Sequence, residues 1–213
     1  MDAPLPYGPL MTRLLRPVQR GFLILNGRFM APALRLGLGR LIGNPFTGHI
    51  LLLRTRGRKT GLLREAPLGY VLRDGAAWVV AGYGEPTPWY RNLVADPDVE
   101  VILPDRRFHG RAEPVTDDAE WLVAYRALLG SFGVIGRGVV GDVSKLGDAE
   151  LLARHRALPV IRIRPTDGTV LEPGPFDPGG LGWLWANLAA LAAAAVVWRT
   201  LSGRRRRSAT PRR

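Results

Sequence analysis

Six short apolar segments joined by turn signals constrain the fold of this chain most strongly. They lie at residues 50–53, 68–72, 78–80, 99–103, 108–112 and 159–164. Asp74-Gly75 and Pro104-Asp105 each separate two of these segments, and Asp-Gly between apolar segments is a strong hairpin signal. The last segment alternates apolar residues with arginine, which is typical of a half-buried strand. Because strands joined largely by hairpins favour an antiparallel barrel over a doubly wound sheet, we expect a mainly β fold with helices (α+β).

Two helices are predicted between these strands. Residues 116–118 place a capping hydroxyl and two carboxylates before the helical segment 120–129. Asp148 begins a second helix, which we expect to continue to Ala157. Residues 130–141, between the two helices, carry glycines at five positions and predict a mobile loop. The carboxylates at 117 and 118 are interpreted as helix-cap groups and not as an acid–base pair.

The ends of the chain differ in composition from the strand region. Residues 1–44 combine regularly spaced apolar residues with arginines and predict short amphipathic helices, lying on the barrel or on an anionic membrane. Residues 45–172 contain the barrel, and 173–180 form a Pro/Gly-rich linker. Residues 181–213 combine an apolar helix with an Arg-rich tail. The start of the chain lacks the pattern of a secretory signal, so we expect the barrel in the cytoplasm.

The segment Leu181–Leu201 predicts an association with the membrane. It contains no acidic residue, and Arg199 is its only basic residue. As a helix it would extend about 31 Å, against about 30 Å for a hydrocarbon layer. Trp183 and Trp198 lie near its two ends, as in interfacial aromatic belts. The barrel and the arginines at 204–207 are both expected on the cytoplasmic side. One crossing cannot place them there, so we favour a helix lying in the interface, with a crossing helix as the alternative.

The composition of the chain limits the kinds of partner and cofactor site that it can form. The formal net charge is +12 and the pI about 11.3, which favours anionic partners. The chain has no cysteine, so disulfides, thiolate zinc sites and iron–sulfur clusters are excluded. The three histidines are far apart in the sequence and are interpreted as structural or surface residues, so we propose no metal site. Redox chemistry would therefore need a bound organic cofactor.

An anion-binding turn is predicted at residues 57–61, where a strand runs into a basic segment bounded by two glycines. Such a turn exposes successive backbone amides, which suit phosphate or carboxylate oxygens. The side chains that would add charge and hydroxyl donors are Arg58, Lys59, Thr60 and Arg64. The spacing does not fit a Walker A loop. Taken alone, the segment could also be a solvated basic hairpin.

The order of these features along the chain resembles the deazaflavin (coenzyme F-420)-dependent nitroreductase and quinone reductase family over about residues 45–115. The resemblance rests on the basic turn at 57–61, the Asp74-Gly75 hairpin, the apolar segment 79–81, and Pro88–Leu93 followed by Asp96-Pro97. It implies a split β-barrel of the flavin-binding type. It also implies transfer of a hydride from reduced coenzyme F-420 to a hydrophobic acceptor, such as a quinone or a nitro compound.

The resemblance further implies which residues bind the cofactor. The basic turn would hold its phosphate and acidic tail, while the end of one strand and the start of the following helix would line the deazaflavin ring. The candidate residues are Gly57, Arg58, Lys59, Thr60, Gly61, Arg64, Val80, Ala81, Gly82, Tyr83, Trp89, Tyr90 and Asn92. No catalytic residue is assigned, because the chemistry belongs to the cofactor; Tyr83 and Tyr90 are the nearby groups that could donate a proton.

Two other classes of function stay open. The same barrel could bind FMN, haem or another tetrapyrrole, or the chain could be a non-enzymatic basic tether to a membrane or to nucleic acid. We expect a small hydrophobic acceptor and an anionic membrane surface as partners, no specific nucleic acid, and leave a homodimer open. The expected location is cytoplasmic, peripheral to the cell membrane or anchored to it through the C-terminal helix.

Overall fold

Six antiparallel strands close into a barrel in the order β1-β2-β3-β6-β5-β4. The computed structural model describes residues 30–134 and 143–208. The strands are β1 (Ile50–Arg56), β2 (Leu63–Arg73), β3 (Ala76–Val80), β4 (Asp98–Ile102), β5 (Arg107–Pro114) and β6 (Val160–Pro165). Each overlaps one of the six predicted apolar segments. The predicted fold, a mainly β antiparallel barrel with helices, is therefore confirmed.

The barrel interior is filled by side chains that alternate with outward-facing ones. In β5, buried and exposed residues alternate from Arg107 to Ala112, so one face of the strand points inward. Tyr70 and Phe108 are the largest side chains buried in this core. The predicted hairpin between β2 and β3 is confirmed: Asp74 and Gly75 have φ of 51° and 69°, and a two-residue turn of this kind matches the twist of the strands.

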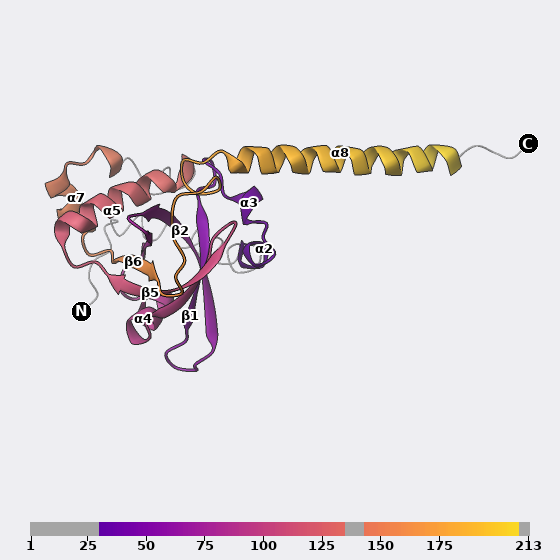
Figure 1. Cartoon of the computed structure of the whole chain (residues 1–213). Helices are drawn as coiled ribbons and strands as arrows, with labels where there is room; N and C mark the ends of the chain where they lie inside the picture. Colours follow the sequence, from indigo (N-terminus) through magenta and orange to yellow (C-terminus); the bar gives the residue numbers. More distant parts are fainter. Residues whose placement is uncertain (1–29, 135–142, 209–213) are drawn as a thin grey trace, which may run out of the picture.

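A second apolar cluster lies outside the barrel, where α5 (Asp118–Ser131) and α7 (Asp148–His155) cover one side of it (Figure 1). The rings of Trp121 and Tyr125 stack at 4.5 Å within this cluster. Asp117 caps α5, accepting a hydrogen bond from Glu120 N at 2.8 Å. The predicted helices are thus present, but α5 extends into the segment predicted as a loop. Most of that loop, residues 135–141, lies outside the described residues.

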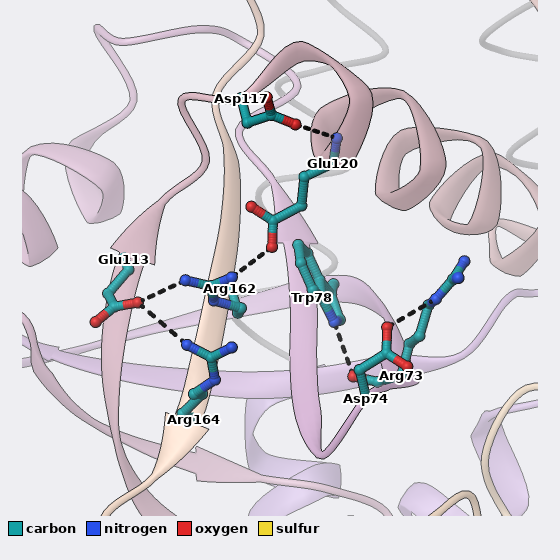
Figure 2. A network of polar contacts seen from close by, with 8 residues as sticks. All are labelled: Arg73, Asp74, Trp78, Glu113, Asp117, Glu120, Arg162 and Arg164. Atoms are coloured by element: carbon teal, nitrogen blue, oxygen red, sulfur yellow. Dashed lines mark hydrogen bonds and ion pairs between the residues drawn. The ribbon is translucent and has the colours of Figure 1, made fainter.

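An arginine joins α5 to the barrel (Figure 2). Arg162 of β6 donates to Glu120 of α5 and, at 2.9 Å, to Glu113 Oε2 of β5. Its guanidinium lies 5.8 Å from the centroid of the Trp78 ring on β3. Arg164 Nη1 reaches the same Glu113 carboxylate at 3.7 Å. The Arg162 side chain therefore contacts groups from α5, β5 and β3, which fixes α5 against the strands.

Two short helices, α2 (Ala31–Arg35) and α3 (Gly39–Ile42), represent the predicted N-terminal helical segment. Ala31 and Leu34 pack against Leu52 of β1, so α2 lies on the barrel. The remainder of the predicted segment, residues 1–29, lies outside the described residues.

The Pro/Gly-rich segment 173–180 packs on the barrel before the chain enters α8 (Gly182–Ser208). Asp177 is 0% exposed and accepts a hydrogen bond from Gly174 N at 2.6 Å. The carbonyl of Phe176 contacts His49 Nδ1 at 3.2 Å. The Asp177 carboxylate also accepts a hydrogen bond from the Tyr70 hydroxyl of β2. The segment is therefore attached to the barrel by a buried carboxylate, which its composition did not predict.

Helix α8 runs away from the barrel, and the body of the protein meets only its beginning (Figure 1). There the Asn187 amide donates to Leu41 O of α3 at 3.3 Å. Farther along, Leu191, Val196 and Trp198 are exposed, Trp198 by 74%. No helix in the described ranges is both long and apolar enough to cross a membrane. The alternative of a crossing helix is therefore not supported.

Candidate cofactor site

The basic turn joins β1 to β2 and has the backbone geometry that its glycines predict. Gly57 N donates to Leu62 O at 2.8 Å, and Gly61 N donates to Gly57 O at 2.7 Å. Gly61 has φ of 67°, where a residue with a side chain is strained. A Cβ at Gly57 would lie 3.0 Å from Leu62 O. Both glycines are thus needed for this turn, and the side chains of Arg58, Lys59 and Thr60 are exposed on it.

The cations of this hairpin fall into two groups. Arg54 pairs with Glu65 and Glu100, each at 2.9 Å. Within residues 30–134 and 143–208, by contrast, no carboxylate pairs with the three cations at the tip, which are Arg58, Lys59 and Arg64. Their positive charge is therefore available to an anion from outside the chain.

Asn92 connects the basic turn to α4 (Pro88–Ala95). Its Oδ1 accepts from Arg58 N at 3.3 Å and from Arg58 Nη1 at 3.1 Å, and its Nδ2 donates to Thr55 Oγ1 at 3.3 Å. The side chain is buried, being 5% exposed. Asn92 therefore holds the guanidinium of Arg58 in place, and its amide is already engaged within the protein.

The remaining candidates lie between β3 and the first turn of α4. Ala81 is fully buried, and its N–H donates to Pro159 O at 2.8 Å. Tyr83 is 40% exposed. Trp89 and Tyr90 meet edge to face with their ring centroids 6.4 Å apart, and both pack against the barrel core. Tyr83 lies in the turn that follows β3, and Trp89 and Tyr90 lie in the first turn of α4; aromatic side chains of this kind suit a place next to a planar ring.

The two tyrosines are poor acids in this environment. Burial raises the pKa of Tyr83. Burial and the nearby Glu85 carboxylate raise the pKa of Tyr90. Both hydroxyls are therefore protonated at neutral pH and can donate hydrogen bonds.

A cleft of about 240 Å³ lies beside Tyr90. It is lined by Glu85 and Tyr90 and by Pro114–Thr116 at the end of β5. Arg156, Ala157 and Pro159, from the connection between α7 and β6, complete the lining. Of the thirteen predicted cofactor-binding residues, Tyr90 alone lines this cleft. No local motif marks the other residues that line the cleft, because they come together only when the barrel closes.

The histidines take the places expected for structural or surface residues. His49 and His155 are buried, and His155 Nδ1 contacts the Tyr125 hydroxyl at 3.0 Å. His109 is exposed on β5. Within the described ranges, no group of three His, Cys, Asp or Glu residues is placed to hold a metal ion.

The segment that contains this site matches the model of a known protein family. The family model described as F-420H(2)-dependent quinone reductase covers residues 30–131. Residues 30–131 carry the pattern of the F-420H(2)-dependent quinone reductases. The resemblance predicted from the sequence is thereby confirmed, and all thirteen predicted cofactor-binding residues lie inside the matched range. Arg156 and the C-terminal helix lie outside it.

Curated relatives from mycobacteria show the same likeness. An F-420H(2)-dependent quinone reductase of Mycobacterium tuberculosis (strain H37Rv) is 44% identical over 69 residues, which is 30% of this chain and 46% of that protein. A putative F-420H(2)-dependent quinone reductase of Mycobacterium bovis gives the same values. The chain thus spans under half the length of the curated relatives it matches.

Solved structures resemble this chain with lower sequence identity. An F-420-H2 dependent reductase is 24% identical with a TM-score of 0.40, covering 54% of this chain and 93% of that chain. The heme storage protein HutZ of Vibrio cholerae is 20% identical with a TM-score of 0.41, covering 57% of this chain and 85% of that chain. Neither likeness identifies a ligand of this chain.

Proposed function

We propose that this chain is an oxidoreductase that transfers a hydride from reduced coenzyme F-420 to a small hydrophobic acceptor, such as a quinone or a nitro compound. The observation that carries the proposal is the basic turn. In the described ranges, Arg58 and Lys59 of the turn and Arg64 at the start of β2 have no carboxylate partner, and Arg58 is held in place by Asn92. The turn lies inside the segment matched by the quinone reductase family.

The donor set suits this cofactor. The guanidinium and ammonium groups of Arg58, Lys59 and Arg64 match a phosphodiester and carboxylates, and the Thr60 hydroxyl adds a neutral donor. Trp89, Tyr90 and the segment Val80–Tyr83 would lie along the deazaflavin ring. When bound, reduced F-420 supplies the hydride. The side chains contribute by binding both reactants and orienting them, and we assign no catalytic acid.

Cofactor titration tests this proposal. We expect the full-length protein to bind oxidised F-420 more tightly than FMN, measured by fluorescence quenching. Replacing Arg58 and Lys59 together with alanine should weaken F-420 binding at least tenfold, about 1.4 kcal/mol. Arg73→Ala is the matched control, since that exposed arginine pairs with its neighbour Asp74 at the other hairpin. A tenfold preference for FMN, or unchanged F-420 binding by the double variant, contradicts the proposal.

We further propose that α8 lies in the interface of an anionic membrane and brings the barrel to hydrophobic acceptors there. Two observations support this: the exposed apolar side chains along α8, including Trp185 and Trp198, and the four arginines at 204–207 that follow. Each arginine near an anionic surface contributes about 1 kcal/mol. Tryptophan side chains are typical of the headgroup region of a bilayer, and arginines next to them can bind anionic lipid.

Vesicle sedimentation tests the membrane proposal. The full chain should sediment with vesicles that contain phosphatidylserine and much less with neutral ones, and high salt should release it. Deleting residues 181–213 should abolish this binding and leave F-420 affinity unchanged, since Asp177 and the barrel stay in place. If the full chain stays in solution with both kinds of vesicle at low salt, α8 is better explained as a contact between two copies of the chain, which size-exclusion chromatography would show.

A further inference from the structure

We propose that the cleft beside Tyr90 binds a neutral quinone of one or two rings, with the guanidinium of Arg156 directed at a carbonyl oxygen of that acceptor. This inference rests on the proposed function, because it names the substrate class and the acceptor subsite of that reductase. Arg156 lies outside the matched family segment, so nothing in the likeness to the family points to it.

Arg156 is held in place before any ligand binds. Its Nε donates to Asp118 Oδ1 at 2.6 Å, and one terminal nitrogen, Nη2, donates to Thr116 O at 2.6 Å. Its guanidinium lies 5.8 Å from the centroid of the Trp121 ring. In the described part of the chain, the second terminal nitrogen, Nη1, has no partner among these contacts. A fixed cation with free N–H donors on the wall of a cleft is suited to an oxygen that gains negative charge.

Tyr90 connects the cleft to the predicted cofactor site. It lines the cleft, and its ring also packs against Trp89 and the barrel core. An acceptor in the cleft would therefore lie next to the residues expected to line the deazaflavin ring. Hydride transfer needs such close placement of donor and acceptor.

The charges around the cleft favour a neutral ligand over an acidic one. Arg156 brings one positive charge, but Asp118 pairs with it and Glu85 also lines the cleft. A carboxylated acceptor would be repelled by Glu85, whereas a neutral carbonyl can still accept a hydrogen bond from Arg156. Pro114, Val115 and Pro159 supply apolar walls. The volume of about 240 Å³ is enough for one or two fused rings.

In this arrangement one hydride and one proton would reduce the quinone to a hydroquinone. One hydride, carrying two electrons, reduces the quinone to a hydroquinone monoanion, and the donor cofactor is oxidised. The negative charge that develops on the quinone oxygen is stabilised by Arg156 and by a hydrogen bond from the Tyr90 hydroxyl. Water at this surface cleft supplies the one proton that converts the monoanion to the neutral hydroquinone. Arg156 would therefore be a catalytic residue, since it touches the acceptor oxygen.

Equilibrium dialysis of menadione against the full-length protein without cofactor tests the subsite. Arg156→Gln should weaken menadione binding about tenfold, about 1.4 kcal/mol. Ala157→Trp should abolish it by filling the cleft, and Ala157 is exposed, so the substitution leaves the core unchanged. Arg154→Gln is the matched control, because that arginine pairs with Glu150 on α7 and does not line the cleft. All three variants should keep wild-type affinity for F-420.

The charge of the ligand gives a second test. Menadione should bind more tightly than 1,4-naphthoquinone-2-sulfonate, and Glu85→Gln should reduce the difference. The proposal is overturned if the wild type does not bind menadione, if Ala157→Trp binds it normally, or if the sulfonate binds more tightly. Loss of F-420 binding by the wild type would instead overturn the proposed function, since menadione binding is measured without the cofactor.

Discussion

The hydroxyl of Tyr70 donates a hydrogen bond of 2.5 Å to the carboxylate of Asp177, and both side chains are 0% exposed. Tyr70 lies on β2, and Asp177 lies in the segment that leads to α8. Arg106, in the turn between β4 and β5, donates to the second carboxylate oxygen at 2.7 Å. Burial raises the pKa of Tyr70, and the Asp177 carboxylate raises it further. One carboxylate thus attaches the base of α8 to two parts of the barrel.

Removing this carboxylate should destabilise the protein strongly. Asp177→Ala removes the buried carboxylate that pairs with Arg106, which keeps, among the described residues, only its pair with Asp105. It also leaves the buried Tyr70 hydroxyl without its acceptor. We expect a loss of about 3 kcal/mol in the free energy of unfolding, since removing one partner of a buried ion pair and the acceptor of a buried hydroxyl are both destabilising. Tyr70→Phe should cost about 1 kcal/mol, because Asp177 keeps its other donors. Urea denaturation measures both. Asp98→Asn, at an exposed pair with Arg111, should change stability by under about 1 kcal/mol.

Stability should fall as the pH falls below about 6.5, the ordinary pKa of histidine. Burial lowers the pKa of His49 and of His155 in the folded protein. Below about 6.5 the unfolded chain therefore binds protons that the folded protein does not, and this favours unfolding until the lowered folded pKa is reached. Urea midpoints across this range measure the effect. The double variant His49→Gln, His155→Gln should show a smaller dependence on pH, and an equal dependence would contradict the assignment.

Asn92 should control cofactor affinity through Arg58. Asn92→Ala removes the acceptor for the Arg58 guanidinium and should weaken F-420 binding about tenfold, about 1.4 kcal/mol. Asn92→Asp keeps the shape but gives Arg58 a carboxylate partner, which would compete with the anion of the cofactor. We therefore expect weaker F-420 binding in both variants, measured by fluorescence titration. Normal binding by Asn92→Asp would show that Arg58 does not contact the cofactor.

Arg162 should couple α5 to the barrel. Arg162→Lys keeps the charge but loses the fork that reaches both Glu113 and Glu120 (Figure 2). We expect a loss of about 1–2 kcal/mol in stability. A double-mutant cycle with Glu120→Gln should give a coupling energy of at least about 0.5 kcal/mol. The exposed pair Arg73–Asp74 in the same view is the control, and its cycle should give a coupling close to zero.

The sequence by itself determined the elements whose signals are local. The six strands, the Asp74-Gly75 turn, the cap of α5 at Asp117 and the glycines of the basic turn each depend on neighbouring residues and backbone geometry. The tertiary structure decided which distant groups meet. The contact between Arg58 and Asn92 joins residues 34 apart, and that between Tyr70 and Asp177 joins residues 107 apart. Closure of the barrel sets these contacts, as it sets the cleft between Tyr90 and Arg156, because side chains separated so widely in sequence carry no shared periodicity that could predict their proximity.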